Sequence, residues 1–109
     1  MFLKHNFLGK PIILKSPVPT ISTYLWQTIV ITCVASGFPQ PFINWRHNWG
    51  NVCEEPRCKI TNYANGTSAF TIADIQAKDA GAYSCEIQNK IDRIFAVDTI
   101  VTINDGMLY

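Results

Sequence analysis

Short stretches in which apolar and polar side chains alternate, the pattern of half-buried β-strands, recur along the chain. Residues 28–34 and 82–88 show the alternation most clearly, and residues 43–46 and 68–75 follow the same rule. The positions predicted to point inward are Ile29, Ile31, Cys33, Ile43, Trp45, Phe70, Ile72, Tyr83, Cys85 and Ile87. No segment has a sustained helical period, so the pattern predicts an all-β protein.

Turn signals separate these stretches roughly every ten residues, which is the spacing of β-sandwiches. Further strands are predicted at 11–15, 20–24 and 57–61, together with a long last strand from Arg93 to Ile103. The prolines of Ser16-Pro17-Val18-Pro19 cannot donate to a ladder, so they divide the first strand into two halves. The predicted loops and turns lie at 37–41, 48–56, 65–66, 76–80 and 89–92. About eight strands of this kind favour a sandwich over a barrel or an α/β fold.

Length and charge narrow the function classes. The 109 residues suffice for one domain, predicted at 11–109 after a tail at 1–10. Nine basic and eight acidic side chains are scattered, whereas a nucleic-acid-binding domain would show a basic stripe. No apolar run reaches the ~18 residues that would predict membrane insertion. The polar residues of Met1–Asn6 interrupt any signal peptide, so we expect a secreted chain of this sequence to be a fragment of a longer protein.

Four cysteines in a short β-rich chain suggest an oxidising compartment, with a reduced cytosolic domain as the alternative. Three pairings are possible, and the sequence alone does not choose among them. The spacing Cys53-x4-Cys58 could also be half of a zinc site. Such a site needs two more ligands, and only His5 and His47 are available, so we predict neither a metal nor a cofactor.

The sequence offers no set of nucleophile, base and orienting acid, and no glycine-rich phosphate loop. Ser84 alternates with inward positions and is predicted to be a surface serine, while His47 has no motif around it. We therefore expect a non-catalytic binding scaffold. Asn65-Gly66-Thr67 is an N-glycosylation sequon on a predicted hairpin turn, although so short a motif also occurs by chance.

One constellation of residues is more specific. Cys33 is followed twelve residues later by Trp45, and Asp79-x-Gly81-x-Tyr83-x-Cys85 completes the order. This arrangement resembles the immunoglobulin superfamily. Gly37-x-Pro39-x-Pro41 before Trp45 resembles its intermediate set. Trp45-Arg46-x-Asn48-Trp49-Gly50 is further similar to the immunoglobulin modules of basement-membrane heparan sulfate proteoglycans of the perlecan type.

The resemblance implies an immunoglobulin-like Greek-key β-sandwich in which Cys33–Cys85 bridges two sheets, leaving Cys53–Cys58 as a local clamp. It also implies that the broken first strand switches sheets. The remaining roles that it implies are a core position for Trp45, a corner position for Tyr83 and an ion pair between Arg57 and Asp79. An exposed Arg57 without a partner is the alternative.

The function implied by the resemblance is that of a secreted spacer and protein-interaction module of a basement-membrane proteoglycan. Its partners would be matrix or cell-surface proteins, and glycosaminoglycan would be carried by other parts of the parent chain. Two alternatives remain: an ectodomain module of a cell-adhesion or receptor protein, and a reduced intracellular module of the muscle type.

The Cys53–Cys58 pair, Ile87 and two turn residues depart from the family pattern, and one tryptophan has no place in it. Trp26 stands where a turn usually has glycine, and Asp92 stands at the glycine of the last hairpin, where it is predicted to adopt a left-handed conformation. Trp49 lies past the strand end and cannot share the core position of Trp45, so we predict that it forms a partner-binding patch with Arg46. The alternative is that Trp49 packs flat over the loop between the other two cysteines.

Overall fold

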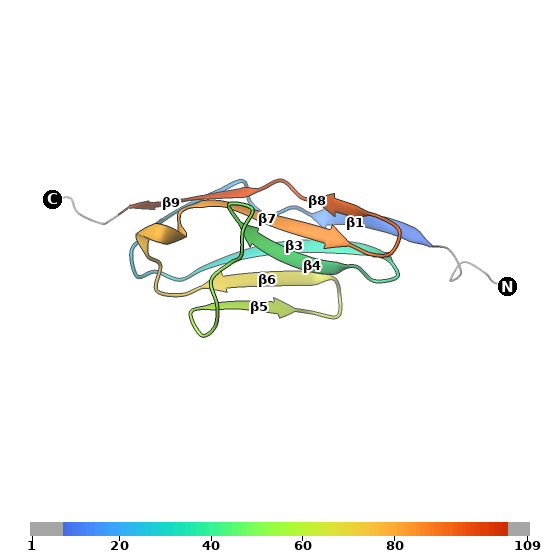
Figure 1. Ribbon diagram of the computed structural model, residues 1–109, viewed down its shortest axis with the longest axis horizontal. Helices are drawn as coiled ribbons and strands as arrows, with labels where there is room; N and C mark the ends of the chain where they lie inside the picture. Colours follow the sequence, from blue (N-terminus) through green and yellow to red (C-terminus); the bar gives the residue numbers. More distant parts are fainter. Residues whose placement is uncertain (1–7, 105–109) are drawn as a thin grey trace.

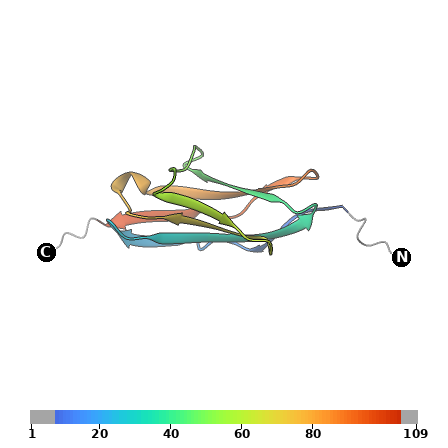
Figure 2. The same ribbon diagram turned by 90° about the horizontal axis from the view of Figure 1, so that it is seen from below.

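The computed structural model describes residues 8–104, which form two β-sheets packed face to face (Figures 1 and 2). The elements are β1 (Gly9–Lys15), β2 (Thr20–Tyr24), β3 (Ile29–Phe38), β4 (Phe42–His47), β5 (Cys58–Asn62), β6 (Thr67–Ile72), the 3₁₀ turn η2 (Ala77–Asp79), β7 (Gly81–Gln88), β8 (Arg93–Phe95) and β9 (Thr99–Asn104). β1 begins at one end of the sandwich and β9 ends at the opposite end (Figure 1). The architecture is the predicted immunoglobulin-like β-sandwich.

The first sheet has the strand order β1-β3-β6-β5, and the second has β2-β9-β7-β4 with β8 also paired to β7. The prolines at 17 and 19 separate β1, which pairs antiparallel with β3, from β2, which pairs parallel with β9. The first strand therefore switches sheets at its prolines, as the resemblance to the immunoglobulin superfamily implied. β1 begins at Gly9, two residues before its expected start, and residues 1–7 of the predicted tail lie outside the described part.

The core lies between the sheets, where the predicted inward side chains meet. A disulfide joins Cys33 of β3 to Cys85 of β7, with 6.6 Å between their Cα atoms. Trp45 is buried beside it, stacks on Phe70 at 5.8 Å between ring centroids, and donates from Nε1 to Ser68 Oγ at 2.9 Å. This bond satisfies the indole N–H, which would otherwise be buried without a partner.

The predicted last strand from Arg93 to Ile103 is wrong, because it is two strands. β8 and β9 both pair with β7, but their registers differ by one residue: Phe95 faces Glu86, and Thr99 faces Tyr83. The N–H of Ala96 donates to the carbonyl of Cys85 at 3.0 Å and holds the chain at this bulge. A bulge of this kind interrupts the ladder and increases the local twist.

Two turns contain residues that depart from the family pattern, Trp26 and Asp92. Trp26 has a φ of 73°, so a tryptophan occupies the left-handed conformation in which glycine is usual. Asp92 has no positive φ, so the predicted left-handed conformation is wrong at this position. The turn is held instead by Asn89, whose Oδ1 accepts the N–H groups of Ile91 and Asp92 at 2.9 and 3.2 Å. A side-chain acceptor of this kind lets the turn form without a glycine.

Candidate functional site

The outer face of the second sheet gathers five side chains from four segments, which we call the Trp49 patch. They are Arg46 of β4, Trp49 of the β4–β5 loop, Glu86 of β7, and Arg93 and Phe95 of β8. The registers of β4 and β8 on β7 bring them together, because side chains at paired positions project from the same face.

Glu86 is the electrostatic centre of the Trp49 patch. Its Oε1 accepts from Arg46 Nε at 3.0 Å and from Asn44 Nδ2 at 3.4 Å, while its Oε2 accepts from Arg93 Nη1 at 3.2 Å. Burial alone would raise the pKa of the Glu86 carboxyl, but the hydrogen bonds from Arg46 and Asn44 and the charges of both arginines lower it below its usual value. One carboxylate and two guanidinium groups leave the patch with a net positive charge.

A tight turn presents Trp49 to solvent. His47 and Gly50 exchange both backbone hydrogen bonds, at 3.0 and 2.8 Å, around Asn48 and Trp49, whose φ values are 49° and 68°. Two central residues with positive φ define a type I′ turn, which normally requires Asn-Gly. Asn48 also ties the turn to Ala82 through its own N–H (2.8 Å) and its Oδ1 (2.9 Å). Trp49 is thus held in a conformation that is unfavourable for a bulky residue.

Trp49 remains 62% exposed. It packs edge-on against Phe95 at 5.4 Å between centroids, and the Arg93 guanidinium lies 5.8 Å from the same Phe95 ring. The aromatic contact of Trp49 is therefore with β8. The alternative prediction had placed the ring flat over the Cys53–Cys58 loop. Sequence reasoning missed Glu86, Arg93 and Phe95 as members of the patch, although alternation along β7 already places Glu86 on the outer face.

Ser84 is not the surface serine that alternation predicted. It does project from the outer face of β7, opposite Arg46, but only 1% of it is exposed. β7 is a central strand, and a short side chain there lies below the longer ones of its neighbours. Its hydroxyl is the one buried side-chain N or O atom without a hydrogen-bond partner in residues 8–104. Ser84 is therefore inaccessible as a nucleophile.

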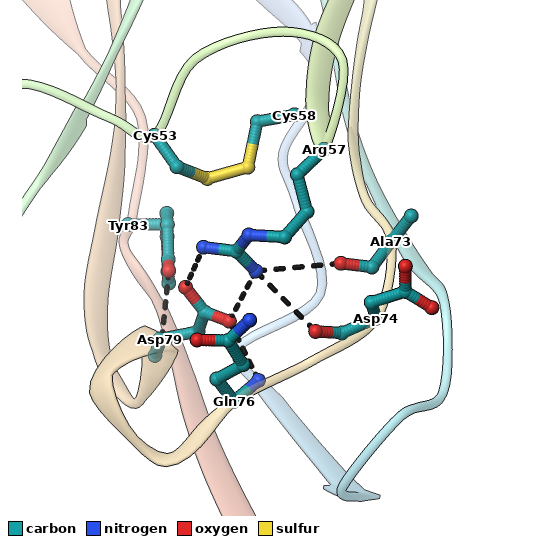
Figure 3. Close-up of a disulfide and its surroundings, with 8 residues drawn as sticks. All are labelled: Cys53, Arg57, Cys58, Ala73, Asp74, Gln76, Asp79 and Tyr83. Atoms are coloured by element: carbon teal, nitrogen blue, oxygen red, sulfur yellow. Dashed lines mark hydrogen bonds and ion pairs between the residues drawn. A yellow bond between two sulfur atoms is a disulfide. The ribbon is translucent and has the colours of Figure 1, made fainter.

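Arg57 and Asp79 form a two-pronged ion pair at the base of the sandwich (Figure 3). Arg57 Nη1 donates to Asp79 Oδ2 at 2.7 Å, and Nη2 donates to Oδ1 at 2.9 Å. Nη1 also lies 3.3 Å from the carbonyl oxygen of Ala73, and Asp79 Oδ2 accepts the N–H of Gln76 at 2.8 Å. Tyr83 completes the arrangement, because its hydroxyl donates to the Asp79 carbonyl at 2.6 Å.

This arrangement shifts three pKa values. Burial favours the neutral Asp79 carboxyl, but the hydrogen bonds from Arg57 and Gln76 outweigh burial and lower its pKa. The hydrogen bond to Asp79 raises the pKa of Arg57. Burial, followed by the Asp79 charge, raises the pKa of Tyr83, so its hydroxyl stays protonated and continues to donate. The Arg57–Asp79 cluster is thus a closed pair without net charge.

Cys53 and Cys58 are joined to each other beside Arg57, with 5.5 Å between their Cα atoms (Figure 3). The bridge closes the loop that leads into β5 and fixes the backbone from which Arg57 projects. Cysteines in a disulfide have no thiolate to offer, which removes the half zinc site from consideration. Along residues 8–104, no group of three or more His, Cys, Asp or Glu side chains gathers as it would around a metal ion.

Two polar candidates lie away from the Trp49 patch. His47 stacks on Tyr83 with 4.3 Å between ring centroids, and its Nε2 lies 2.7 Å from the Ala80 carbonyl oxygen, so it packs as part of the β4–β7 pair. Asn65 is exposed in the β5–β6 turn, where the Asn-Gly pair predicted a hairpin. No helix in the described part of the chain is long and apolar enough to cross a membrane.

Comparison with known proteins identifies the family. The model of the immunoglobulin domain family matches residues 10–89. The chain therefore belongs to the immunoglobulin domain family, as its cysteine, tryptophan and tyrosine positions predicted. Among solved structures, the tandem Ig repeats of Dlar superpose with a TM-score of 0.81 at 26% identity, over 92% of this chain and 51% of that one. An I-band fragment of titin superposes with a TM-score of 0.84 at 15% identity, over 90% of this chain and 34% of the fragment, which supports the fold alone.

Several curated proteins are more than 30% identical to most of this chain. It is 41% identical over 97 residues to the basement membrane proteoglycan of Caenorhabditis elegans, covering 88% of this chain and 3% of that protein. It is 38% identical over 87 residues to the basement membrane-specific heparan sulfate proteoglycan core protein of Mus musculus, covering 80% and 2%. Human neogenin is 34% identical over 85 residues, covering 78% and 6%. The chain thus spans only a few per cent of the length of these relatives.

Proposed function

We propose that this chain is a non-catalytic, extracellular immunoglobulin module of a basement-membrane or matrix proteoglycan, where it acts as a spacer and binds a protein partner through the Trp49 patch. The observation that carries the binding role is Trp49, a largely exposed tryptophan held at positive φ by a type I′ turn. Glycosaminoglycan would be borne by other parts of the parent chain.

The spacer role is supported by the way in which the chain runs through the domain. β1 begins at one end of the sandwich and β9 ends at the other, so modules of this kind can be joined end to end (Figure 1). The relatives with the highest identities above are large proteins in which this chain matches only one small portion. The extracellular location is supported by the two disulfides, which use all four cysteines.

The binding role is supported by three properties of the Trp49 patch. An unfavourable backbone conformation that persists in a structure points to a functional constraint at that position. Exposed tryptophan and arginine side chains are enriched at the energetic centres of interfaces. The two arginines exceed the single buried carboxylate in charge, so we expect a partner surface that carries an acidic group beside an apolar one.

A pair of tryptophans gives the test a matched control. Trp26 is 67% exposed and also has a positive φ, but it lies in the β2–β3 turn, outside the patch. Immobilised wild type, Trp49→Ala and Trp26→Ala would be compared in pull-downs from basement-membrane extract, with captured proteins quantified by mass spectrometry. The affinity of any protein held by the wild type would then be measured on each variant.

We expect Trp49→Ala to lose ~2 kcal/mol or more of binding, about 30-fold, while Trp26→Ala keeps the wild-type affinity. Equal affinity of all three proteins would refute a role for the patch. A Trp49→Ala variant that loses stability yet retains affinity would show that the ring serves packing alone.

A second candidate is an ectodomain module of a cell-adhesion or receptor protein. It is favoured by the similarity to neogenin and, at 28% identity, to the human cell adhesion molecule DSCAML1. A transmembrane segment in the full-length gene product would favour this candidate over the matrix protein. A thiol titration of the unfolded chain that finds free cysteines would instead favour a reduced intracellular module.

A further inference from the structure

The β5–β6 turn combines an N-glycosylation sequon with an exposed tyrosine, and the proposed function involves neither of them. Tyr63-Ala64-Asn65-Gly66-Thr67 closes as a three-residue loop: the Gly66 N–H donates to the Tyr63 carbonyl at 3.1 Å, and the Tyr63 N–H donates to the Thr67 carbonyl at 2.8 Å. Gly66 follows with a φ of 92°. A hairpin of this form is a turn followed by a glycine bulge.

The turn is rigidly attached to the body of the sandwich. The Ala35 N–H on β3 donates to the Gly66 carbonyl at 3.0 Å, and a Cβ on Gly66 would collide with the Ala35 carbonyl oxygen. Any other residue at position 66 would therefore have to push the hairpin away from β3. These contacts fix the position of the turn backbone against β3.

The orientation of Asn65 suits it to carry a glycan. Its Oδ1 accepts the N–H of Thr67 at 3.0 Å, so the carboxamide is anchored through its oxygen and the turn does not use the nitrogen for this bond. Tyr63 and Thr67 continue the β5–β6 register and project from the same side of the hairpin. Asn65 lies in the loop that joins these two residues, so a sugar attached to its nitrogen starts next to the pair.

A hollow of about 260 Å³ opens beside the turn, and Tyr63 and Thr67 form part of its wall. Across it lies Phe42, the first residue of β4, which is 83% exposed and has no aromatic partner in the described part of the chain. The other polar wall groups are the amides of Gln40 and Asn62, and no charged side chain lines it. Aromatic faces with neutral amides match a pyranose ring, which has C–H faces and hydroxyl edges.

We propose that Asn65 is N-glycosylated and that the first N-acetylglucosamine stacks on Tyr63, with the next sugar lying over the hollow toward Phe42. This inference rests on the extracellular location proposed above but not on the Trp49 patch. It gives the exposed Tyr63 and Phe42 rings an intramolecular partner that is covalently attached to the chain.

The attachment is a group transfer whose donor is a lipid-diphosphate-linked oligosaccharide in the secretory pathway. The Asn65 Nδ2 attacks C1 of the first N-acetylglucosamine, forming the N–C1 bond. The bond from C1 to the phosphate oxygen breaks, and the lipid diphosphate leaves with its electron pair. The amide nitrogen gives up one proton to a base of the transferase.

The test compares one sequence with and without its sugar. The chain is secreted from eukaryotic cells and trimmed by an endoglycosidase to a single N-acetylglucosamine, and the same sequence is made without glycosylation in the bacterial periplasm. Tyr63→Ala is made in both forms. Tyr24→Ala is the matched control, because Tyr24 is equally exposed on β2 and lies outside the hollow. Asn65→Gln cannot carry a sugar at this position. Comparing its intact mass with that of the secreted wild type measures how much of Asn65 is glycosylated.

We expect the single sugar to raise Tm by about 4 °C in the wild type and in Tyr24→Ala, and to leave the Tm of Tyr63→Ala unchanged. The acetyl methyl resonance of the sugar should be shifted upfield by the tyrosine ring and return to its ordinary position in Tyr63→Ala. An unoccupied Asn65 in the secreted protein, or an equal Tm gain in all three backgrounds, would overturn the inference. Trp49→Ala leaves this gain intact, so failure here and failure of the partner patch are separate results.

Discussion

The Arg57–Asp79 ion pair should be energetically coupled, and a double-mutant cycle with Arg57→Ala and Asp79→Ala tests this. Both side chains are largely removed from water, with 19% and 4% of their surfaces exposed. Each guanidinium nitrogen donates to a different carboxylate oxygen, so either substitution removes both hydrogen bonds at once. Asp79→Ala additionally leaves the Gln76 N–H without its acceptor.

The expected coupling energy of the Arg57–Asp79 pair follows from its burial and its geometry. An exposed ion pair contributes ~0–1 kcal/mol, whereas a hydrogen bond to a charged group in a buried setting contributes about 1.5–3 kcal/mol. We expect Asp79→Ala to cost about 3–4 kcal/mol, because it leaves the largely buried Arg57 charge without its carboxylate partner. The coupling between the two substitutions should be about 2 kcal/mol. Arg57→Lys keeps the charge but loses the planar fork, so we expect it to recover less than half of the coupling.

Urea unfolding at several pH values is the assay. The folded pKa of Asp79 is lowered, so its contribution is fully present above the unfolded value of about 3.9 and is lost as the pH falls through the folded value. The coupling should therefore be complete at pH 7 and shrink as the pH falls below the unfolded pKa. Asp98→Ala, outside the pair, should show no coupling to Arg57→Ala. A pH-independent coupling below about 0.5 kcal/mol would refute the buried two-pronged pair.

Three further predictions concern other parts of the domain. Replacing Cys53 and Cys58 by serine should lower the free energy of unfolding by ~2 kcal/mol in urea titrations, and no change would mean that the clamp is dispensable. Trp49→Gly should be more stable than Trp49→Ala by about 1 kcal/mol, because glycine relieves the positive φ; equal melting curves would contradict a strained turn. Glu86→Gln should cost about 2 kcal/mol at pH 7, and this difference should fade as acid protonates the wild-type carboxyl, whose folded pKa is lowered. If Glu86→Gln were as stable as the wild type at pH 7, the negative charge of Glu86 would contribute no stability through its two arginine partners.

Much of the fold was readable from local pattern. Alternation identified the inward faces of β3 and β7, the prolines at 17 and 19 divided the first strand, and Asn65-Gly66 marked the β5–β6 hairpin. These features depend on the chemistry of neighbouring residues: a period of two selects one face of a strand, and a residue without an N–H cannot continue a ladder. The family motif then supplied the long-range pairings that local pattern cannot.

The last strand shows where local pattern fails. Residues 93–103 were predicted as one strand, but the chain leaves the ladder between β8 and β9, where the Ala96 N–H donates to the carbonyl of Cys85 on β7. The shift of register by one residue is a property of the pair of strands. The register shift therefore cannot be read from this segment alone, because it is defined by the pairing of β8 and β9 with β7.

The Trp49 patch and the burial of Ser84 were likewise decided by tertiary structure. Alternation placed Ser84 on the outer face but could not show that it would be buried there, opposite Arg46 of β4. The sequence singled out Trp49, while only the packing of β8 beside β7 brought Phe95 into edge-on contact with its ring and Arg93 to Glu86. A sequence determines which side of a strand a residue occupies, whereas the neighbours that cover that side come from strands whose order and register only the assembled sheet fixes.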